Sequence, residues 1–347
     1  MIIGRAFILL LTLRVSMSLA LAHDGSAEPS PGADAATLKR ILANWNAQED
    51  RVKTFHFVTR VRLTLLKGTI DNLREPERKG QVFYCDKDVV YEHVDETWVD
   101  GDNRCRNESG EFLNPPPANT ARPGRVALRT TFDGKDFTWL IIGPLCRGPR
   151  HSTSGFVRGV VEKMNVADRR LDGPFRFAFR ASHPATPWRA DNCRVITENG
   201  IIDGVRYTEI ERSVSGGRRR GPNYCRAWVD PRRDDVVVYW EERDDPLDAW
   251  TWHGSIDYRK DPKYGWIPSH WKSSCPGPQA RTEDCTVIRY AINQKLSPEL
   301  FAPKLPPGTP VRDRTSGQQY VVEKDGSKRM ITREEVKRLW QPFPAPK

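Results

Sequence analysis

The stretch Tyr224–Glu242, YCRAWVDPRRDDVVVYWEE, decides the fold of this chain. Large and small side chains alternate as far as Val229, the dipeptide Asp230-Pro231 opens a turn, and a second apolar run ends at Trp240. A period of two with β-branched and aromatic residues on both sides of a turn is typical of a β-hairpin. The same pattern recurs through most of the 347 residues, without regular helices between the strands. We therefore predict a mainly β protein of the α+β class, built on a large antiparallel sheet.

An amphipathic helix is predicted ahead of the sheet. Asp34 is a suitable N-cap for a helix that runs to about Val52. Apolar residues at helical spacing share one of its faces, namely Leu38, Ile41, Leu42 and Trp45. Because a lone amphipathic helix is marginal in water, this face should pack on the sheet. The spacing then changes to a period of two, in a strand whose apolar face carries Phe55, Phe57, Val61, Leu63 and Leu65.

Two long stretches interrupt the strand pattern and are predicted to be insertions. Residues 101–125 contain the run Pro115–Pro117, which no central strand can hold, and are predicted to be a loop. Residues 143–190 form the second insertion. Its residues 157–164 carry valines and a methionine at helical spacing, whereas residues 175–179 have the alternation of a short strand.

The ends of the chain are expected to lie outside the main domain. Residues 1–22 have the pattern of an export signal, with Arg5 before an apolar run and Ala-Leu-Ala ending at Ala22. The rest is divided by composition into a flexible leader at 23–34, a sheet domain at 35–315 and a C-terminal hairpin with a short helix at 316–347. Thr332 and Glu335 have the spacing of a capping box for that helix. We expect an exported protein that is soluble in the periplasm or outside the cell.

The seven cysteines fit an oxidising compartment. Cys275 and Cys285 flank a loop rich in proline and glycine, so they are the first candidate pair for a disulfide, and Cys85 with Cys105 is the second. No two cysteines have the C-x-x-C spacing of a zinc or redox site. The sequence predicts neither a metal nor a cofactor.

The net charge of +10 favours anionic partners such as lipid head groups. Its densest basic run is Arg218, Arg219 and Arg220, in a glycine-rich loop. In an exported protein this run does not predict binding to nucleic acid. We expect it to contact anionic head groups at a membrane surface or a partner protein of the cell envelope.

One histidine pair leaves an enzymatic alternative open. His253 and His270 fall in adjacent predicted strands, with Asp257 close to them in the sequence. If those strands pair, the three side chains come together as a small metal or acid–base site, the chemistry of a secreted hydrolase. The spacings of zinc proteases, serine-hydrolase elbows and phosphate-binding loops do not occur. We expect a protein that is not an enzyme and keep the hydrolase as the alternative.

Five stretches together resemble a known family. They are LKRILANWNAQEDRVKTFHFVTRVRL (38–63), TTFDGKDFTWL (130–140), IIDGVRYTEIER (201–212), CRAWVDPRRDDVVVYWEE (225–242) and LSPELFAPKLPPGTPVRD (296–313). A helix followed by long strands and a proline-rich closing segment resembles the LolA/LppX-type superfamily of periplasmic lipoprotein carriers, which includes the RseB type. The Trp-x-Asp-Pro turn and the closing Pro-Gly-Thr segment are similar to those of exported paralogues in planctomycete-type bacteria.

This resemblance implies a sheet curled into an open half-barrel around an apolar cavity plugged by helices. The residues expected to line the cavity are Phe57, Val61, Leu63, Trp139, Trp228, Trp240 and Trp252. Such a cavity suits acyl chains, because burial of apolar surface is favourable. The resemblance therefore implies a binding protein for an apolar or acylated ligand, either a lipid or a lipoprotein. A module for protein–protein interaction in the envelope stays open as a further alternative.

Overall fold

The structure is a computed structural model that describes residues 31–69, 84–101, 104–109, 127–143, 156–163, 174–179, 188–202, 204–214, 223–243, 252–276, 280–302, 305–332 and 334–335. Two α-helices occur in this part, α1 (Pro31–Arg51) and α2 (Pro174–Phe179). The first strands are β1 (Thr54–Leu65), β2 (Val89–Asp100), β3 (Arg104–Ser109), β4 (Ala127–Phe132), β5 (Asp136–Gly143), β6 (Phe156–Lys163), β7 (Cys193–Ile202) and β8 (Val205–Val214). The others are β9 (Asn223–Asp230), β10 (Val236–Arg243), β11 (Trp252–Asp261), β12 (Gly265–Cys275), β13 (Arg281–Ile292), β14 (Pro310–Asp313), β15 (Gln319–Val322) and β16 (Lys328–Met330).

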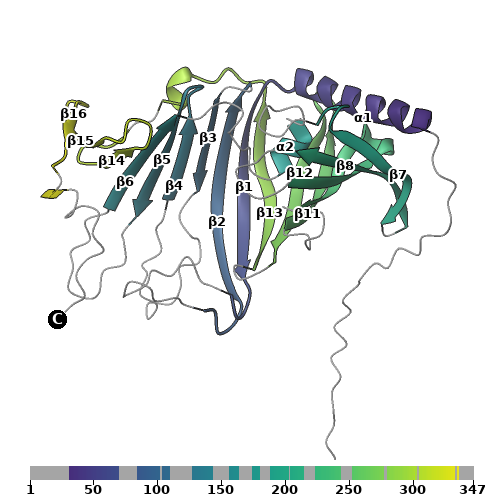
Figure 1. Cartoon of the computed structure of the whole chain (residues 1–347), viewed down its shortest axis with the longest axis horizontal. Coiled ribbons are helices and arrows are strands. Elements are labelled where there is room, and N and C mark those ends of the chain that lie inside the picture. The colour runs from purple at the N-terminus through teal and green to yellow at the C-terminus, as the bar shows by residue number, and fades with distance from the viewer. Residues whose placement is uncertain are drawn as a thin grey trace, which may run out of the picture.

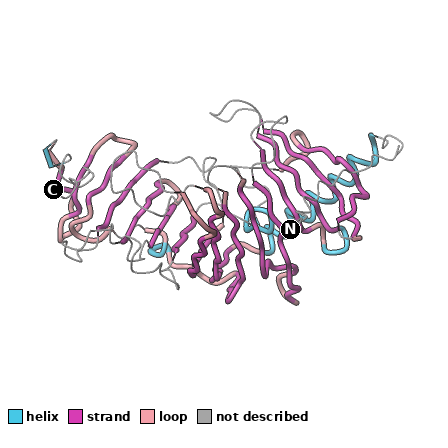
Figure 2. Tube along the Cα trace, turned by 90° about the horizontal axis from the view of Figure 1, so that it is seen from below, coloured by secondary structure: helices cyan, strands magenta, loops and turns pink. Residues whose placement is uncertain are grey.

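All sixteen described strands belong to one sheet, in the order β16-β15-β14-β6-β5-β4-β3-β2-β1-β13-β12-β11-β10-β9-β8-β7. Neighbouring strands pair antiparallel, except that β14 runs parallel to β6. The outer strands β16 and β7 do not pair with each other, so the sheet stays open. Its row of strands bends around α2 in one half of the molecule (Figures 1 and 2). The prediction of a mainly β protein with a curved, largely antiparallel sheet is confirmed.

The hairpin that decides the fold is β9–β10, and its turn is held by charge. Asp230 caps the short 3₁₀ turn Pro231–Arg233 by accepting a hydrogen bond from the backbone N–H of Arg232 (3.0 Å). The guanidinium groups of Arg232 and Arg233 also donate to its carboxylate, at 2.9 and 2.8 Å. Burial alone would raise the pKa of Asp230, yet these hydrogen bonds hold it below its ordinary value. The Asp-Pro turn read from the sequence is therefore present.

Helix α1 lies across the ends of the strands and is anchored on this same turn (Figure 1). The Trp45 indole donates a hydrogen bond to the backbone carbonyl of Asp235 (2.6 Å), and the Asn44 amide donates to its carboxylate (2.7 Å). Gln48 reaches the next turn, where its amide donates to the carbonyl of Tyr264 (3.1 Å). Leu38, Ile41 and Trp45 are buried, so the predicted amphipathic face packs as expected. The helix begins at Pro31, before the predicted cap.

The main core lies on one face of the sheet. We call the face on which α2 packs the inner face, and the opposite one the outer face. In β9, Cys225, Ala227 and Val229 are all buried and point to the inner face, whereas Trp228 between them is only half-buried. The core cluster joins these residues to the buried side of α1, to β1 and to α2. Strand alternation therefore fixes which side chains meet the helices.

Three element predictions are wrong. Residues 104–109, expected in a loop, form β3, because the backbone pairs with β2 and β4 on its two sides even though the side chains are mostly polar. Residues 156–163, with helical spacing, form β6, which pairs with both β5 and β14. Residues 175–179, expected as a strand, belong to helix α2. Apolar side chains surround α2, so every phenylalanine is buried whichever side of the helix it occupies.

The expected Cys275–Cys285 disulfide is not formed. In the register of β12 and β13, Cys275 lies opposite Arg281, whereas Cys285 lies opposite Trp271. The two thiols are therefore separated along the hairpin by several residues, too far for a disulfide without movement of the backbone. Both of these thiols are free, and the side chain of Cys105, the expected partner of Cys85, lies outside the described residues.

The C-terminal hairpin is present as β15 and β16, and β14 joins it to the main sheet. Thr332 and Glu335 make the predicted capping box. The Thr332 N–H donates to the Glu335 carboxylate (2.9 Å), and the Glu335 N–H donates to the Thr332 hydroxyl (3.2 Å). The rest of the predicted helix lies outside the described residues. Among the described helices, none has the length and apolar character to span a membrane.

Candidate functional site

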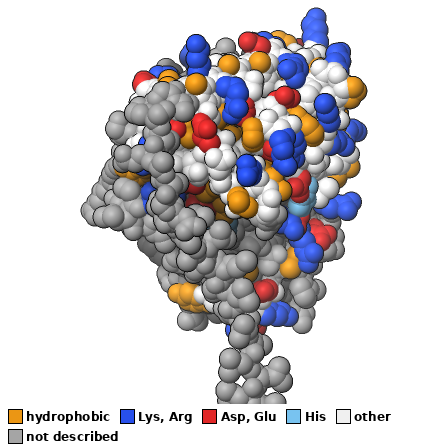
Figure 3. All heavy atoms as spheres, turned by 90° about the vertical axis from the view of Figure 1, so that its right-hand side faces the viewer, with side chains coloured by type: hydrophobic (Ala, Val, Ile, Leu, Met, Phe, Trp, Pro, Cys, Tyr) orange, Lys and Arg blue, Asp and Glu red, His pale blue; other side chains and the backbone are white. Residues whose placement is uncertain are grey.

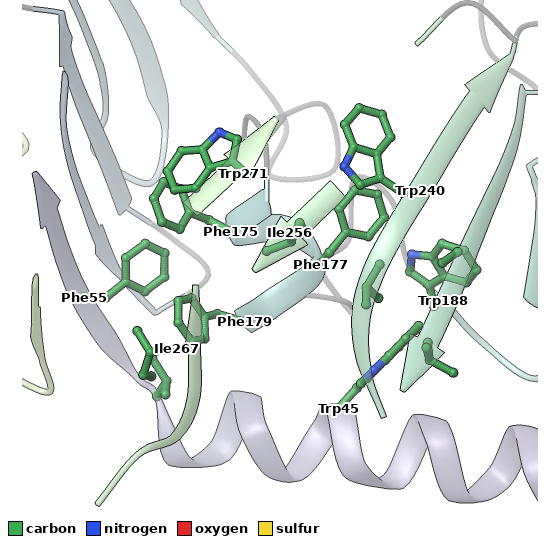
Figure 4. Close-up of a cluster of buried hydrophobic side chains, with 14 of the residues drawn as sticks. Trp45, Phe55, Phe175, Phe177, Phe179, Trp188, Trp240, Ile256, Ile267 and Trp271 are labelled. Carbon is green, nitrogen blue, oxygen red and sulfur yellow. The ribbon is translucent and has the colours of Figure 1, made fainter. Parts of the chain in front are cut away.

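Helix α2 fills the bend of the sheet with aromatic rings. Phe175, Phe177 and Phe179 are 5%, 3% and 1% exposed, and we call them the aromatic plug. The ring of Phe177 stacks on Trp240 of β10, with centroids 5.4 Å apart. The ring of Phe175 meets Trp271 of β12 edge to face at 5.4 Å. Figure 4 shows these rings between the strands, above α1.

Helix α2 depends on the burial of the aromatic plug, because the helix has only six residues. A helix of that length is not stable alone in water, so its tertiary contacts must maintain it. Burial of one phenylalanine side chain contributes roughly 1.5–3 kcal/mol. On the β1 side, Phe179 lies 5.2 Å from the ring of Phe55, and Phe175 lies 4.8 Å from that of Phe57. The space taken by the plug is therefore a continuous apolar site on the inner face.

A small cleft reaches the aromatic plug from under α1. Its volume is about 110 Å³. It is lined by Asn44, Trp45 and Gln48 of α1, by Phe177 of α2, and by Val236 and Trp266 near the hairpin turns. This space is too small for an acyl chain, since ligand pockets commonly measure about 300–1,000 Å³. A larger ligand can occupy the inner face here only if the plug moves aside.

The structure brings together four of the residues expected to line a cavity. Phe57, Val61 and Trp240 belong to the main core, and Trp252 packs against it with its ring 5.4 Å from that of Trp240. Leu63 instead packs on a small separate cluster formed by Leu65, Cys85 and Tyr91. Trp139 lies in β5, and its side chain is outside the described residues.

Trp228 does not face the core. Its ring lies against Tyr239 with centroids 5.0 Å apart, on the outer face. The reason is the alternation of β9, in which the small residues Cys225 and Ala227 point inward. Because the aromatic rings from α2 and from Trp188 take up the room there, small side chains suit the strand and the large ones point outward. Trp228 therefore cannot line a cavity on the inner face.

A row of polar groups crosses the inner face beside the plug. From β11 to β7, each residue of the row lies opposite the next one on the neighbouring strand, in the order Trp252, Glu242, Cys225, Arg212 and Cys193. Glu242 forms an ion pair with Arg176 of α2. Burial raises the pKa of Cys225 to about 12 and that of Cys193 to about 11, so both thiols stay neutral. The charges in this row therefore come from Glu242, Arg176 and Arg212.

Arg212 is the functional candidate that the sequence analysis missed. Its side chain is 3% exposed, and its guanidinium lies over the Trp188 ring at 5.2 Å. Burial lowers the pKa of Arg212. Its Nε and Nη1 atoms have no hydrogen-bond partner in the described part of the chain. The alternation of β8 could have indicated that Arg212 is buried, because Arg212 shares a face with the core residue Ile210.

The two histidines of the enzymatic alternative do not meet. His270 lies between two carboxylates on the outer face, with Nδ1 3.0 Å from Asp257 and Nε2 2.8 Å from Asp284. Burial would lower the pKa of His270, yet these hydrogen bonds raise it. With both ring nitrogens held by carboxylates, His270 has no free nitrogen to act as a general base. His253 lies beside the Tyr239 ring instead, at 6.3 Å.

No other catalytic or metal centre emerges from the described residues. None of their histidine, cysteine, aspartate and glutamate side chains form a group of three that could hold a metal. Arg218, Arg219 and Arg220 lie outside the described residues. On the side shown in Figure 3, near β7, the drawn Lys and Arg side chains stand among acidic and apolar ones without forming one patch.

The comparisons with known proteins find likeness in structure alone. No protein-family profile matches the sequence, and no curated protein matches it. An outer membrane lipoprotein-sorting protein domain from Vibrio parahaemolyticus is similar with a TM-score of 0.45 and 11% identity, over 78% of this chain and 97% of that one. A DUF1329 family protein from Desulfovibrio piger has a TM-score of 0.40 and 12% identity, over 77% and 95%. A LolA superfamily protein from Nitrosomonas europaea is similar with a TM-score of 0.43 and 11% identity, over 78% of this chain and 98% of that one.

Proposed function

We propose that this chain is an exported, non-enzymatic binding protein that holds an apolar or acylated ligand on the inner face of its sheet. The observation that carries the proposal is the aromatic plug, a six-residue helix that alone fills a site lined by Phe57, Trp240 and Trp271. A ligand with an acyl chain replaces ring contacts with chain contacts of the same kind. The apolar lining of the site then stays buried when the plug moves.

The cleft under α1 supports this exchange. Its lining includes Phe177 and the neighbouring Ala178. An acyl chain that contacts these residues begins to compete with the plug before the helix has moved far. The positive net charge suits delivery from, or to, a surface with anionic head groups. Lipids and the lipid part of lipoproteins are the ligands that combine an acyl chain with such a surface.

Native mass spectrometry of the full chain, exported to a bacterial periplasm and purified without detergent, tests the proposal. We expect a bound mass in the range of acyl lipids that organic extraction removes. The extracted protein should then bind dodecanol, which carries an acyl-length chain without a charge. A clean mass of the protein alone, together with no binding of dodecanol, of dodecanoate or of phospholipid vesicles, would rule out the proposed function.

A further inference from the structure

The surroundings of the buried Arg212 narrow the chemical class of ligand that the protein can bind. The buried polar atoms without a hydrogen bond in the described part of the chain include the Nε and Nη1 atoms of Arg212 and the indole Nε1 of Trp188. All three are donors. Trp188 is 3% exposed, like Arg212, and the guanidinium lies over its ring. A buried donor left unpaired is costly, so this place is chemically complementary to a group that offers only acceptors.

The charges of the row point to the same chemistry. Two guanidinium groups, those of Arg176 and Arg212, lie near one carboxylate, that of Glu242. Arg176 already forms an ion pair with Glu242. Among the described residues of this row, the charges of Arg176, Arg212 and Glu242 leave one positive charge in excess, which is unfavourable when buried. A single anion beside Arg212 would supply the missing charge and an acceptor for these donors.

The surroundings of Arg212 show how a chain could follow that anion. On the paired strand β9, Cys225 and Ala227 form a strip of small, buried side chains that runs from Arg212 toward Trp240 and the plug. We propose that the site takes single-chain amphiphiles with a carboxylate head group, with the head bound by Arg212 and Trp188 and the chain in the place of the aromatic plug. This inference rests on the proposed function and specifies its ligand class.

Calorimetric titration of the full chain with two amphiphiles of equal length tests the inference. Dodecanoate and dodecanol differ only in the head group, and at about pH 8 the carboxyl group is ionised. Hydrogen bonds to a charged group contribute enough for roughly 10- to 100-fold in affinity. We therefore expect dodecanoate to bind tighter than dodecanol by about that factor.

Two variants identify the residue responsible. Arg212→Met, which keeps an unbranched side chain of similar volume without the charge, should remove the preference for dodecanoate and leave the affinity for dodecanol. Arg206→Met is the matched control, since Arg206 is an exposed arginine on the same strand, and it should keep the preference. Equal binding of both amphiphiles by the unmodified chain would overturn the inference and leave the proposed function standing, whereas binding of neither would overturn both. A preference that persists in Arg212→Met would assign the head group to another place.

Discussion

A buried guanidinium on the inner face of the sheet has a consequence for stability as well as for binding. Arg212 is buried beside Trp188, Cys193 and Cys225, and the carboxylate near it, that of Glu242, already forms an ion pair with Arg176. Desolvation of an ion costs several kcal/mol even after the protein relaxes. The unliganded protein therefore tolerates a group that a stable core would not contain, as expected where binding rather than stability selects the residue.

Replacement of this charge should stabilise the unliganded protein. We expect Arg212→Met to raise the free energy of unfolding by about 1–4 kcal/mol, the range found when buried ionic groups give way to apolar ones of similar volume. Urea unfolding of ligand-free protein measures it. The exposed Arg206→Met should change the same quantity by less than about 0.5 kcal/mol. Loss of stability in Arg212→Met, with no loss in the control, would mean that the guanidinium is compensated in the fold.

His270 should stabilise the protein only at low pH. Its pKa is raised in the folded state because the hydrogen bonds to Asp257 and Asp284 outweigh its burial. A raised pKa gives stability that is fully present below the unfolded value of about 6.5 and is lost as the pH rises through the folded pKa. His270→Gln should therefore cost more stability at about pH 5.5 than at about pH 8.5 in urea unfolding. In an Asp257→Asn/Asp284→Asn background that pH dependence should vanish, and its persistence there would contradict the assignment.

At the scale of elements, period-two alternation could be read from the sequence wherever one face of a strand is buried. The apolar face of residues 55–65 and the β9–β10 hairpin are confirmed for this reason. Alternation does not say which face is inner, so Trp228 was placed with the core although the small Cys225 and Ala227 point there. Helix α2 escaped prediction because a helix buried on all sides has no apolar stripe.

The exchange of α2 for a ligand can be tested on the aromatic plug itself. Phe177→Ala should destabilise the protein by about 3–5 kcal/mol and, by weakening the competitor, tighten the binding of dodecanol. Phe301 is fully buried but lies outside the core cluster that contains α2, so Phe301→Ala is the matched control. It should lose similar stability without a change in affinity. Phe177→Leu and Phe301→Leu repeat the comparison at smaller cost, and equal affinities in all four variants would show that the plug does not compete with the ligand.

At the scale of the whole molecule, the sequence predicted the class of fold and not the order of its strands. Period-two patterning predicts on which face of the sheet a side chain lies. It does not predict which strands pair with each other, because that depends on backbone hydrogen bonds. Thus β3 and β6 were read as insertions, although they form part of the sheet. The resemblance to the LolA superfamily implied an open, curved sheet, and the strand order bears that out. It did not indicate Arg212, because a single buried charge belongs to no shared motif.

The parallel pairing of β14 with β6 makes the C-terminal strands a cover for the end of the main sheet. Val311 of β14 is fully buried and packs with Leu305 and with Val161 of β6. A chain that ends at residue 304 should expose the backbone of β6 and these apolar side chains, and an uncovered apolar edge pairs with other copies. We expect it to self-associate in light scattering, whereas a chain that ends at residue 335 keeps β14–β16 and should stay as dispersed as the full chain. If the shorter chain were equally dispersed and equally stable, the strands β14–β16 would be an appendage rather than part of the sheet.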